Sequence, residues 1–149
     1  SPVLPLIGGG GTRFQPVYVG DVAAAVAATV FSADRRPNGA GTTYELGGPE
    51  FFTFRQLMET ILQATGRTRL LVPVPFAIME WGGVLLSLAP QQLLTRDQVR
   101  MMRNDNTAEQ GLPGLADLDI DPTAVSAIVP SYLGRYRRGG EFSRRSSAI

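Results

Sequence analysis

The chain has 149 residues, a formal net charge of +1, no Cys and no His, and every basic residue is Arg. A chain of this length fills one domain and buries roughly two-thirds of its unfolded surface without needing metals or disulfides. The missing residue types exclude a thiolate nucleophile, an imidazole base, the usual zinc site and a Walker lysine, and the near-neutral charge argues against a nucleic-acid partner.

Residues 1–12 are rich in Pro and Gly and predict a flexible lead, in which Gly8–Gly11 acts as a hinge. A dinucleotide fingerprint requires glycines spaced G-x-G-x-x-G, and Arg13 takes the place of the last glycine. We therefore expect order to begin near Arg13, with a short β-prone segment at Phe14–Val19.

A helix is predicted after this segment, with Asp21 suited to cap its start. The apolar face expected from helical spacing consists of Val22, Val26, Val30 and Ala33. The many alanines between these residues predict that the helix lies close against another surface. Beyond it, Arg35–Gly41 reads as a polar turn and Thr42–Leu46 as a second short strand.

The clearest local pattern is a helix that begins after Thr53. Thr53 and Gln56 have capping-box spacing, and Gly66 is placed to end the helix. The apolar stripe between them consists of Phe54, Leu57, Met58, Ile61 and Leu62. Arg69–Val74 is then a third predicted strand.

The stretch Leu70–Ala89 is about as long as a membrane-spanning helix. Pro73, Pro75 and Glu80 interrupt its apolar character, so a buried or interface helix beginning at Pro75 is the better interpretation. Large apolar residues on it, Trp81 among them, indicate core packing more than a ligand pocket.

In the last third of the chain, Thr95 and Gln98 again have capping-box spacing, which predicts a short helix through Met102. An extended run follows over Gln110–Asp119. A final helix is expected to start at Asp121 and Pro122.

Asp117, Asp119 and Asp121 alternate as calcium-loop ligands do, but Pro122 replaces the required glycine. We interpret the segment as extended, with Leu118 and Ile120 turned inward and the carboxylates facing water. The chain beyond it ends in a basic tail, residues 137–149, that we expect to be mobile.

Strands separated by helices indicate an α/β protein, here an α+β fragment with about three short strands and four to five helices. The domain organisation predicted is a flexible lead at 1–12, one lobe at 13–136 and a basic tail at 137–149. Since the start at Ser1 shows neither a basic leader nor a cleavable apolar core, we expect a cytoplasmic protein.

Three motifs follow one another in a recognisable order. The segment Arg13-Phe-Gln-Pro-Val-Tyr-Val-Gly-Asp-Val-Ala23 is followed by Thr43-Tyr-Glu-Leu-Gly-Gly-Pro-Glu50 and by Thr53-Phe-Arg-Gln-Leu. This order resembles the C-terminal, substrate-side lobe of Rossmann-type extended short-chain dehydrogenase/reductase proteins (NAD-dependent epimerase/dehydratase-like). The later segments, Leu94–Val99 and Asp105–Thr107, look most like the atypical branch that contains the NADPH-carrying accessory subunit of respiratory complex I.

The resemblance implies an upstream Rossmann domain that carries the NAD(P) site, so NAD(P) is expected in the full-length protein and not in this chain. The family's Tyr-x-x-x-Lys pair is missing, and no catalytic, cofactor-binding or metal-binding residue is assigned. Arg13, Gln15 and Pro16 are the candidates for the substrate cleft. Phe14 stands where sugar-nucleotide enzymes of the family place an Arg, which favours the atypical branch.

The resemblance thus implies a C-terminal lobe of an NAD(P)-binding protein like the complex I (NADH:ubiquinone oxidoreductase) accessory subunit, which supplies cleft walls and partner contacts but no catalysis. Part of a nucleotide-sugar epimerase, dehydratase or reductase is one alternative. A membrane-surface or complex-assembly module, peripheral on the cytoplasmic side of the inner membrane, is another. Separated from its Rossmann domain, the lobe is expected to self-associate.

Overall fold

A computed structural model describes residues 2–31, 41–78 and 96–137. The chain divides into two compact units. Unit 1 comprises Ser1–Phe14, Phe52–Asn106 and Leu133–Ile149, and unit 2 comprises Gln15–Phe51 and Thr107–Tyr132. The mixed α/β character predicted from the sequence is confirmed, with four strands and four α-helices in the described part of the chain. No helix among the described residues has the length and apolar character that crossing a membrane requires.

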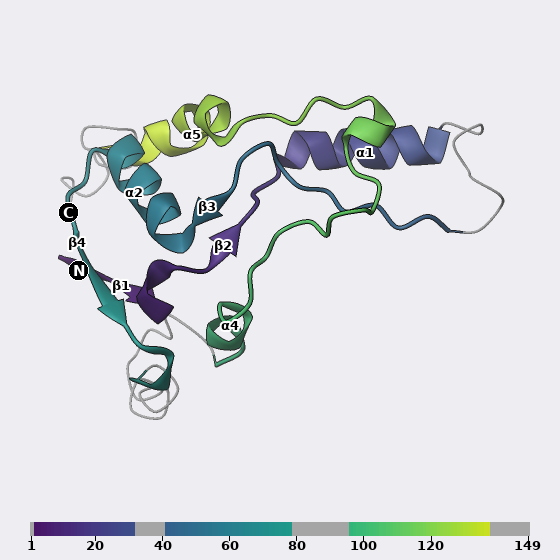
Figure 1. Ribbon diagram of the computed structural model, residues 1–149. Helices are drawn as coiled ribbons and strands as arrows, with labels where there is room; N and C mark the ends of the chain where they lie inside the picture. The colour runs from purple at the N-terminus through teal and green to yellow at the C-terminus, as the bar shows by residue number, and fades with distance from the viewer. Residues whose placement is uncertain (1, 32–40, 79–95, 138–149) are drawn as a thin grey trace. The chain divides into compact units, whose positions relative to one another are not determined.

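Unit 1 contains a parallel strand pair. Strand β1 (Val3–Ile7) pairs with β4 (Leu70–Val74), with Val3 opposite Leu70 and Ile7 opposite Val74 (Figure 1). Leu6 and Ile7 are fully buried. Residues 3–7, which were expected to belong to a flexible lead, are therefore an ordered strand whose last two side chains are buried.

The glycines after β1 form a tight turn and not a hinge. Gly8–Gly10 is a short 3-10 helix (η1), and Gly8, Gly9 and Gly10 all have positive φ, which side chains rarely adopt. A Cβ on Gly8 would lie 2.2 Å from the Phe76 ring. Side chains of the protein pack against the backbone of this turn, so little space is left beside its glycines.

The remaining elements of unit 1 are short strands and helices. Strand β2 (Arg13–Phe14) pairs antiparallel with β3 (Phe52–Thr53), and α2 (Phe54–Thr65) follows directly. The helix α4 covers Arg96–Met101, and the 3-10 turn η4 covers Gly134–Tyr136. The predicted strand at Phe14–Val19 is thus only its first residue plus Arg13, since the chain leaves the sheet at Gln15.

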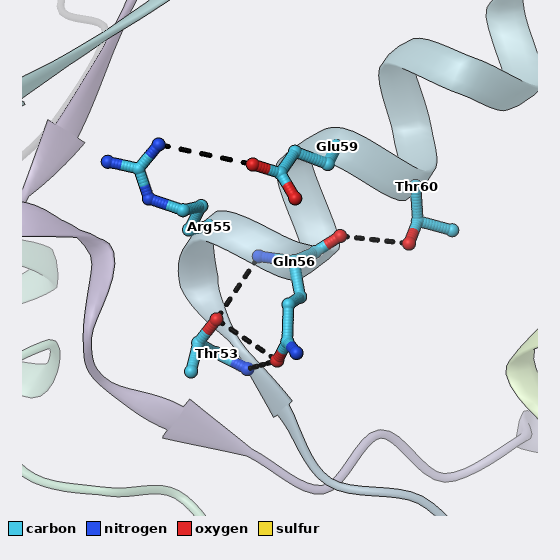
Figure 2. Close-up of polar contacts among 5 residues, drawn as sticks. All are labelled: Thr53, Arg55, Gln56, Glu59 and Thr60. Carbon is cyan, nitrogen blue, oxygen red and sulfur yellow. Dashed lines mark hydrogen bonds and ion pairs between the residues drawn. The ribbon is translucent and has the colours of Figure 1, made fainter.

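Helix α2 confirms the capping box predicted from the sequence. The Thr53 hydroxyl accepts from the Gln56 backbone N–H, and the Gln56 side chain accepts from the Thr53 N–H at 2.7 Å (Figure 2). Gly66 ends the helix in the left-handed conformation, as predicted. An ion pair of Arg55 with Glu59 lies on the exposed face.

Unit 2 contains α1 (Val19–Phe31), the 3-10 turn η3 (Ala116–Leu118) and most of α5 (Val125–Leu133). Its core is small: Ala25, Leu115 and Leu118 are buried and pack together. Leu118 and Ile120 point inward while Asp117 and Asp119 are exposed, as predicted, but Ala116–Leu118 is a 3-10 turn and not the extended segment that was expected. The predicted strand at Thr42–Leu46 is irregular backbone held by a hydrogen bond from Glu45 N to Pro113 O.

Helix α1 differs from the prediction in its start and its face. It begins at Val19, so Asp21 lies inside its first turn. Val26 and Val30 are 57% and 61% exposed, whereas Ala25 is 3% exposed. The small alanine side chains let the helix approach η3 closely, and the valines therefore face away. Several predicted features lie outside the described residues: Ala33, the turn at Arg35–Gly41 except its last residue, most of the apolar helix after Pro75, Thr95 and residues 138–149 of the tail.

Candidate functional site

In unit 1, strand β2 is tied to the turn that follows α4. Arg13 N donates to Asp105 Oδ1 at 2.8 Å, and Asn106 N donates to Arg13 O at 2.8 Å. The Thr12 hydroxyl donates to the Met102 carbonyl, and Phe14 makes a parallel bridge with Asn106. These contacts fix residues 102–106 against the strand, although the two segments are far apart in sequence.

A hollow of about 520 Å³, which we call the unit 1 hollow, lies at this junction. Its lining residues come from β2, α4 and the turn after α4: Phe14, Gln98, Met101, Met102, Asn104, Asp105 and Asn106. Its volume falls within the roughly 300–1,000 Å³ typical of small-molecule sites. An aromatic ring, two thioethers and three side-chain amides suit a ligand that has both an apolar face and a hydrogen-bonding edge.

The aromatic wall of the hollow is held in place by a second ring. Phe14 lies with its centroid 6.3 Å from that of Phe54, the first residue of α2, at an interplanar angle of 50°. This tilted arrangement is a favourable one for aromatic pairs. The position at which sugar-nucleotide enzymes carry an Arg is thus occupied by a packed ring.

The three predicted cleft residues belong to two different units. Arg13 is exposed on β2 in unit 1, and its backbone anchors the 102–106 turn. Gln15 is half-buried in unit 2. Its Nε2 donates to Gly48 O at 2.8 Å, and its Oε1 accepts from Ala108 N at 2.9 Å. Because both ends of the Gln15 amide bind backbone, its role in the structure is to join two loops.

Pro16 lies beside the Gly47-Gly48 pair. A Cβ on Gly48 would lie 1.9 Å from the Pro16 carbonyl oxygen, and one on Gly47 would lie 2.4 Å from the Gln15 side chain. Gly48 is required because the Pro16 backbone approaches too closely for any side chain, whereas Gly47 leaves room for the Gln15 amide. The motif Gly-Gly-Pro, which in the sequence marks only a turn, therefore shapes this part of unit 2.

Pro16 also lines a groove of about 280 Å³, which we call the unit 2 groove. Its walls come from the segment before α1 and from α5: Pro16, Val17, Tyr18, Val19, Thr123, Val125, Ile128, Val129 and Tyr132. The buried carboxylate of Asp21 fixes the two walls together, since it accepts from Thr123 N at 2.7 Å and from Thr123 Oγ1 at 2.8 Å.

Residues such as Gln98, Asn104 and Asn106 were not among the candidates that the sequence suggested. Gln98 and Asn106 were signalled only by the family segments Leu94–Val99 and Asp105–Thr107, and Asn104 by nothing, because exposed amides in a polar run look like any surface loop. In the part of the chain that the structure describes, no three His, Cys, Asp or Glu side chains gather as metal ligands.

The chain resembles both solved structures and proteins of known sequence. The chain superposes on the Citrobacter sp. triphenylmethane reductase with a TM-score of 0.59 and 17% identity, over 87% of this chain and 44% of that one. This likeness confirms the predicted α/β fold class. No protein-family profile matches the chain.

The sequence relatives are more specific. The "NADH dehydrogenase (ubiquinone) 1 alpha subcomplex subunit 9, mitochondrial" of Arabidopsis thaliana is 35% identical over 92% of this chain and 36% of its own length. The protein of the same name from Rattus norvegicus is 32% identical over 83% of this chain and 32% of its own length. The Neurospora crassa "NADH-ubiquinone oxidoreductase 40 kDa subunit, mitochondrial" is 26% identical, over 84% of this chain and 32% of its own.

The predicted resemblance is therefore confirmed. Over more than four-fifths of its residues the chain is similar to the complex I subunits named above, the branch of the extended short-chain dehydrogenase/reductase proteins that its motifs resemble. It spans about a third of the length of these relatives.

Proposed function

We propose that the chain is part of an accessory subunit of a respiratory NADH:ubiquinone oxidoreductase, in which it forms one wall of a ligand cleft and contacts partner subunits. The observation that supports this most is its similarity to complex I subunits from a plant, mammals and a fungus across more than four-fifths of its residues. Peripheral attachment through protein contacts, on the cytoplasmic side of the inner membrane, is part of the proposal.

The unit 1 hollow is the surface that we assign to the ligand cleft. Its lining includes no Arg or Lys among the described residues, so it lacks the guanidinium that would grip a sugar-nucleotide phosphate. Phe14 and the methionines favour a ligand with an apolar, flat portion. This supports the accessory-subunit proposal over a nucleotide-sugar enzyme.

The dinucleotide itself is assigned to the rest of the protein. The glycines at Gly8–Gly10 do not fit a phosphate, because η1 packs against Phe76 and Arg55 and Gly10 is buried. In addition, none of the chain's tyrosines is followed four residues later by Lys. We therefore assign neither NAD(P) binding nor catalysis to these residues alone.

The proposal is tested by tagging the protein that contains this chain in its native host and separating its complexes on a native gel. We expect the tag to migrate with the NADH:ubiquinone oxidoreductase activity. Deletion of the protein should reduce the amount of assembled enzyme, and restoring it should recover that amount. A tag that migrates only as a small species, with the assembled enzyme unchanged by the deletion, contradicts the proposal.

A second measurement concerns the cofactor. In a fluorescence titration with NADPH, the 149-residue chain is expected to show no saturable signal, while the longer protein that includes the flanking sequence binds. Micromolar binding by the 149-residue chain alone would contradict the assignment of the dinucleotide to other residues.

A further inference from the structure

The unit 2 groove differs from the unit 1 hollow in size and in chemistry. Its volume, about 280 Å³, lies just below the roughly 300–1,000 Å³ usual for small-molecule sites. Apart from Thr123 and the two tyrosines at positions 18 and 132, its lining residues are apolar. A space of this size and character suits one or two large apolar side chains of another protein.

The apolar surface continues from the groove along α1. Val19 lines the groove, and Val26 and Val30 follow it at intervals of seven and four residues, which places all three on one helical face. All three side chains are more than half exposed. From Val19 to Val30 the helix rises about 16 Å, a length that matches roughly three turns of a partner helix.

The charge of unit 2 is one-sided. In its described portion there is no Arg or Lys, while its acidic residues are Asp21, Glu45, Glu50, Glu109, Asp117, Asp119 and Asp121. Asp121 is exposed and stands two residues before Thr123 of the groove. Arg35 and Arg36 belong to the same unit by sequence and lie outside the described residues, and the unit remains acidic when they are counted with Asp34.

From these observations we infer that the unit 2 groove and the exposed face of α1 form a docking site for a basic amphipathic helix of a partner protein. The partner's apolar face would cover Val19, Val26 and Val30 and insert an anchor side chain into the groove. Its basic residues would be attracted by the net negative charge of unit 2, which favours this partner electrostatically over an anionic membrane or an acidic protein. The inference rests on the proposed function in one respect: it specifies which kind of partner the chain contacts.

The test uses the full chain and a synthetic helical peptide with Leu and Trp on one face and Arg on the other. Binding is measured by fluorescence anisotropy at low ionic strength, below the concentration at which the chain self-associates. The control peptide carries Glu in place of each Arg. We expect the basic peptide to bind at least about tenfold more tightly than the acidic one, and its affinity to fall as salt is added.

Two matched variants locate the binding surface. Tyr132 is half exposed at the groove and Leu112 is exposed elsewhere in unit 2, so both tolerate replacement by Lys. Tyr132→Lys should lower the affinity for the basic peptide by about fivefold or more, because it removes an anchor contact and adds repulsion. Leu112→Lys should change this affinity by less than about twofold. Circular dichroism is used to check that both variants remain folded. Ile128→Ala, which enlarges the groove without adding charge, is a second groove variant and should also weaken binding.

Several results would overturn the inference. Equal binding of the basic and acidic peptides, or equal effects of the two Lys variants, would show that the groove does not select this partner. Self-association that disappears in Tyr132→Lys would show that a second copy occupies the site. An apolar dye that saturates the groove and is not displaced by the peptide would show a small-molecule site instead. Each of these outcomes is independent of whether the protein migrates with the respiratory enzyme.

Discussion

Asp21 connects the start of α1 to the segment that precedes α5. It is 7% exposed, and its two carboxylate oxygens accept from the backbone and the hydroxyl of Thr123. Hydrogen bonds to a charged group contribute about 1.5–3 kcal/mol each when the geometry is good. The residue therefore stabilises unit 2 through a contact between positions more than a hundred residues apart in sequence.

We predict that Asp21→Ala lowers the free energy of unfolding by about 2–4 kcal/mol, because it leaves the Thr123 N–H without its buried acceptor. Urea denaturation followed by circular dichroism measures the change. Asp121→Ala is the matched control, since Asp121 is exposed in the same segment, and should alter stability by less than about 0.5 kcal/mol. Equal losses in both variants would mean that the Thr123 contact is not what stabilises unit 2.

Gln15 shows why single-residue roles were hard to infer from the sequence. Its place before Pro16, in a segment like the mouth of a family cleft, suggested ligand contact. Its amide is instead used on Gly48 and Ala108, and neither partner is near it in sequence. The prediction that Arg13, Gln15 and Pro16 line a substrate cleft stays a prediction, with Gln15 the weakest of the three.

Among the helices, α2 is the one whose local sequence carries most of the information. The Thr53 and Gln56 side chains satisfy backbone groups at its start, and Thr60 returns a hydrogen bond to the Gln56 carbonyl at 2.8 Å (Figure 2). These interactions join residues only three or four apart. A pattern within one helical turn was therefore enough to predict where the helix starts, and Gly66 alone predicted where it ends.

We predict that Thr53→Ala destabilises the chain by about 1 kcal/mol, since it removes the acceptor for the Gln56 N–H. Thr53→Ser, which keeps the hydroxyl, should restore most of this loss. Thr68→Ala, at an exposed position beyond the end of α2, serves as the control and should change stability by less than about 0.5 kcal/mol. The three variants are compared by thermal and urea unfolding, and a neutral Thr53→Ala would show that the cap does not limit stability.

The strand β1 and the helix α1 were predicted less well, for a common reason. The strand that pairs with β1 is distant from it in sequence, and Val26 and Val30 are exposed because Ala25 makes the closer approach to η3. Which face of an element is covered depends on its tertiary neighbours. The periodicity of apolar residues correctly predicted that α1 is a helix, but it did not predict which side of the helix faces the core.

At the scale of the whole molecule, the exposed apolar surface is large. More than ten large hydrophobic side chains are exposed, among them Val19, Val30, Phe31, Leu70 and Ile78, while each unit has a small core. Such surface usually marks contacts with other protein. It agrees with a chain that spans about a third of its relatives' length.

We therefore predict that the 149-residue chain self-associates, so that its mass by light scattering rises with concentration. The effect should persist in the Tyr132→Lys variant, because most of the exposed apolar residues lie away from the groove. The longer protein, which includes the flanking sequence, is the control and should show less association. A constant monomer mass at high concentration would indicate that the 149 residues form an independent domain.

The pairing of β1 with β4 has a consequence for how the chain reaches its native state. The two strands run parallel, and β2, α1, β3 and α2 all lie between them in sequence. Joining them closes a long loop and gains the burial of Leu6 and Ile7 only at the end, so this pairing is costly to nucleate. Folding of unit 1 should consequently be slow compared with the formation of α2. During refolding, the backbone amides of β1 should become protected from hydrogen exchange later than those of α2.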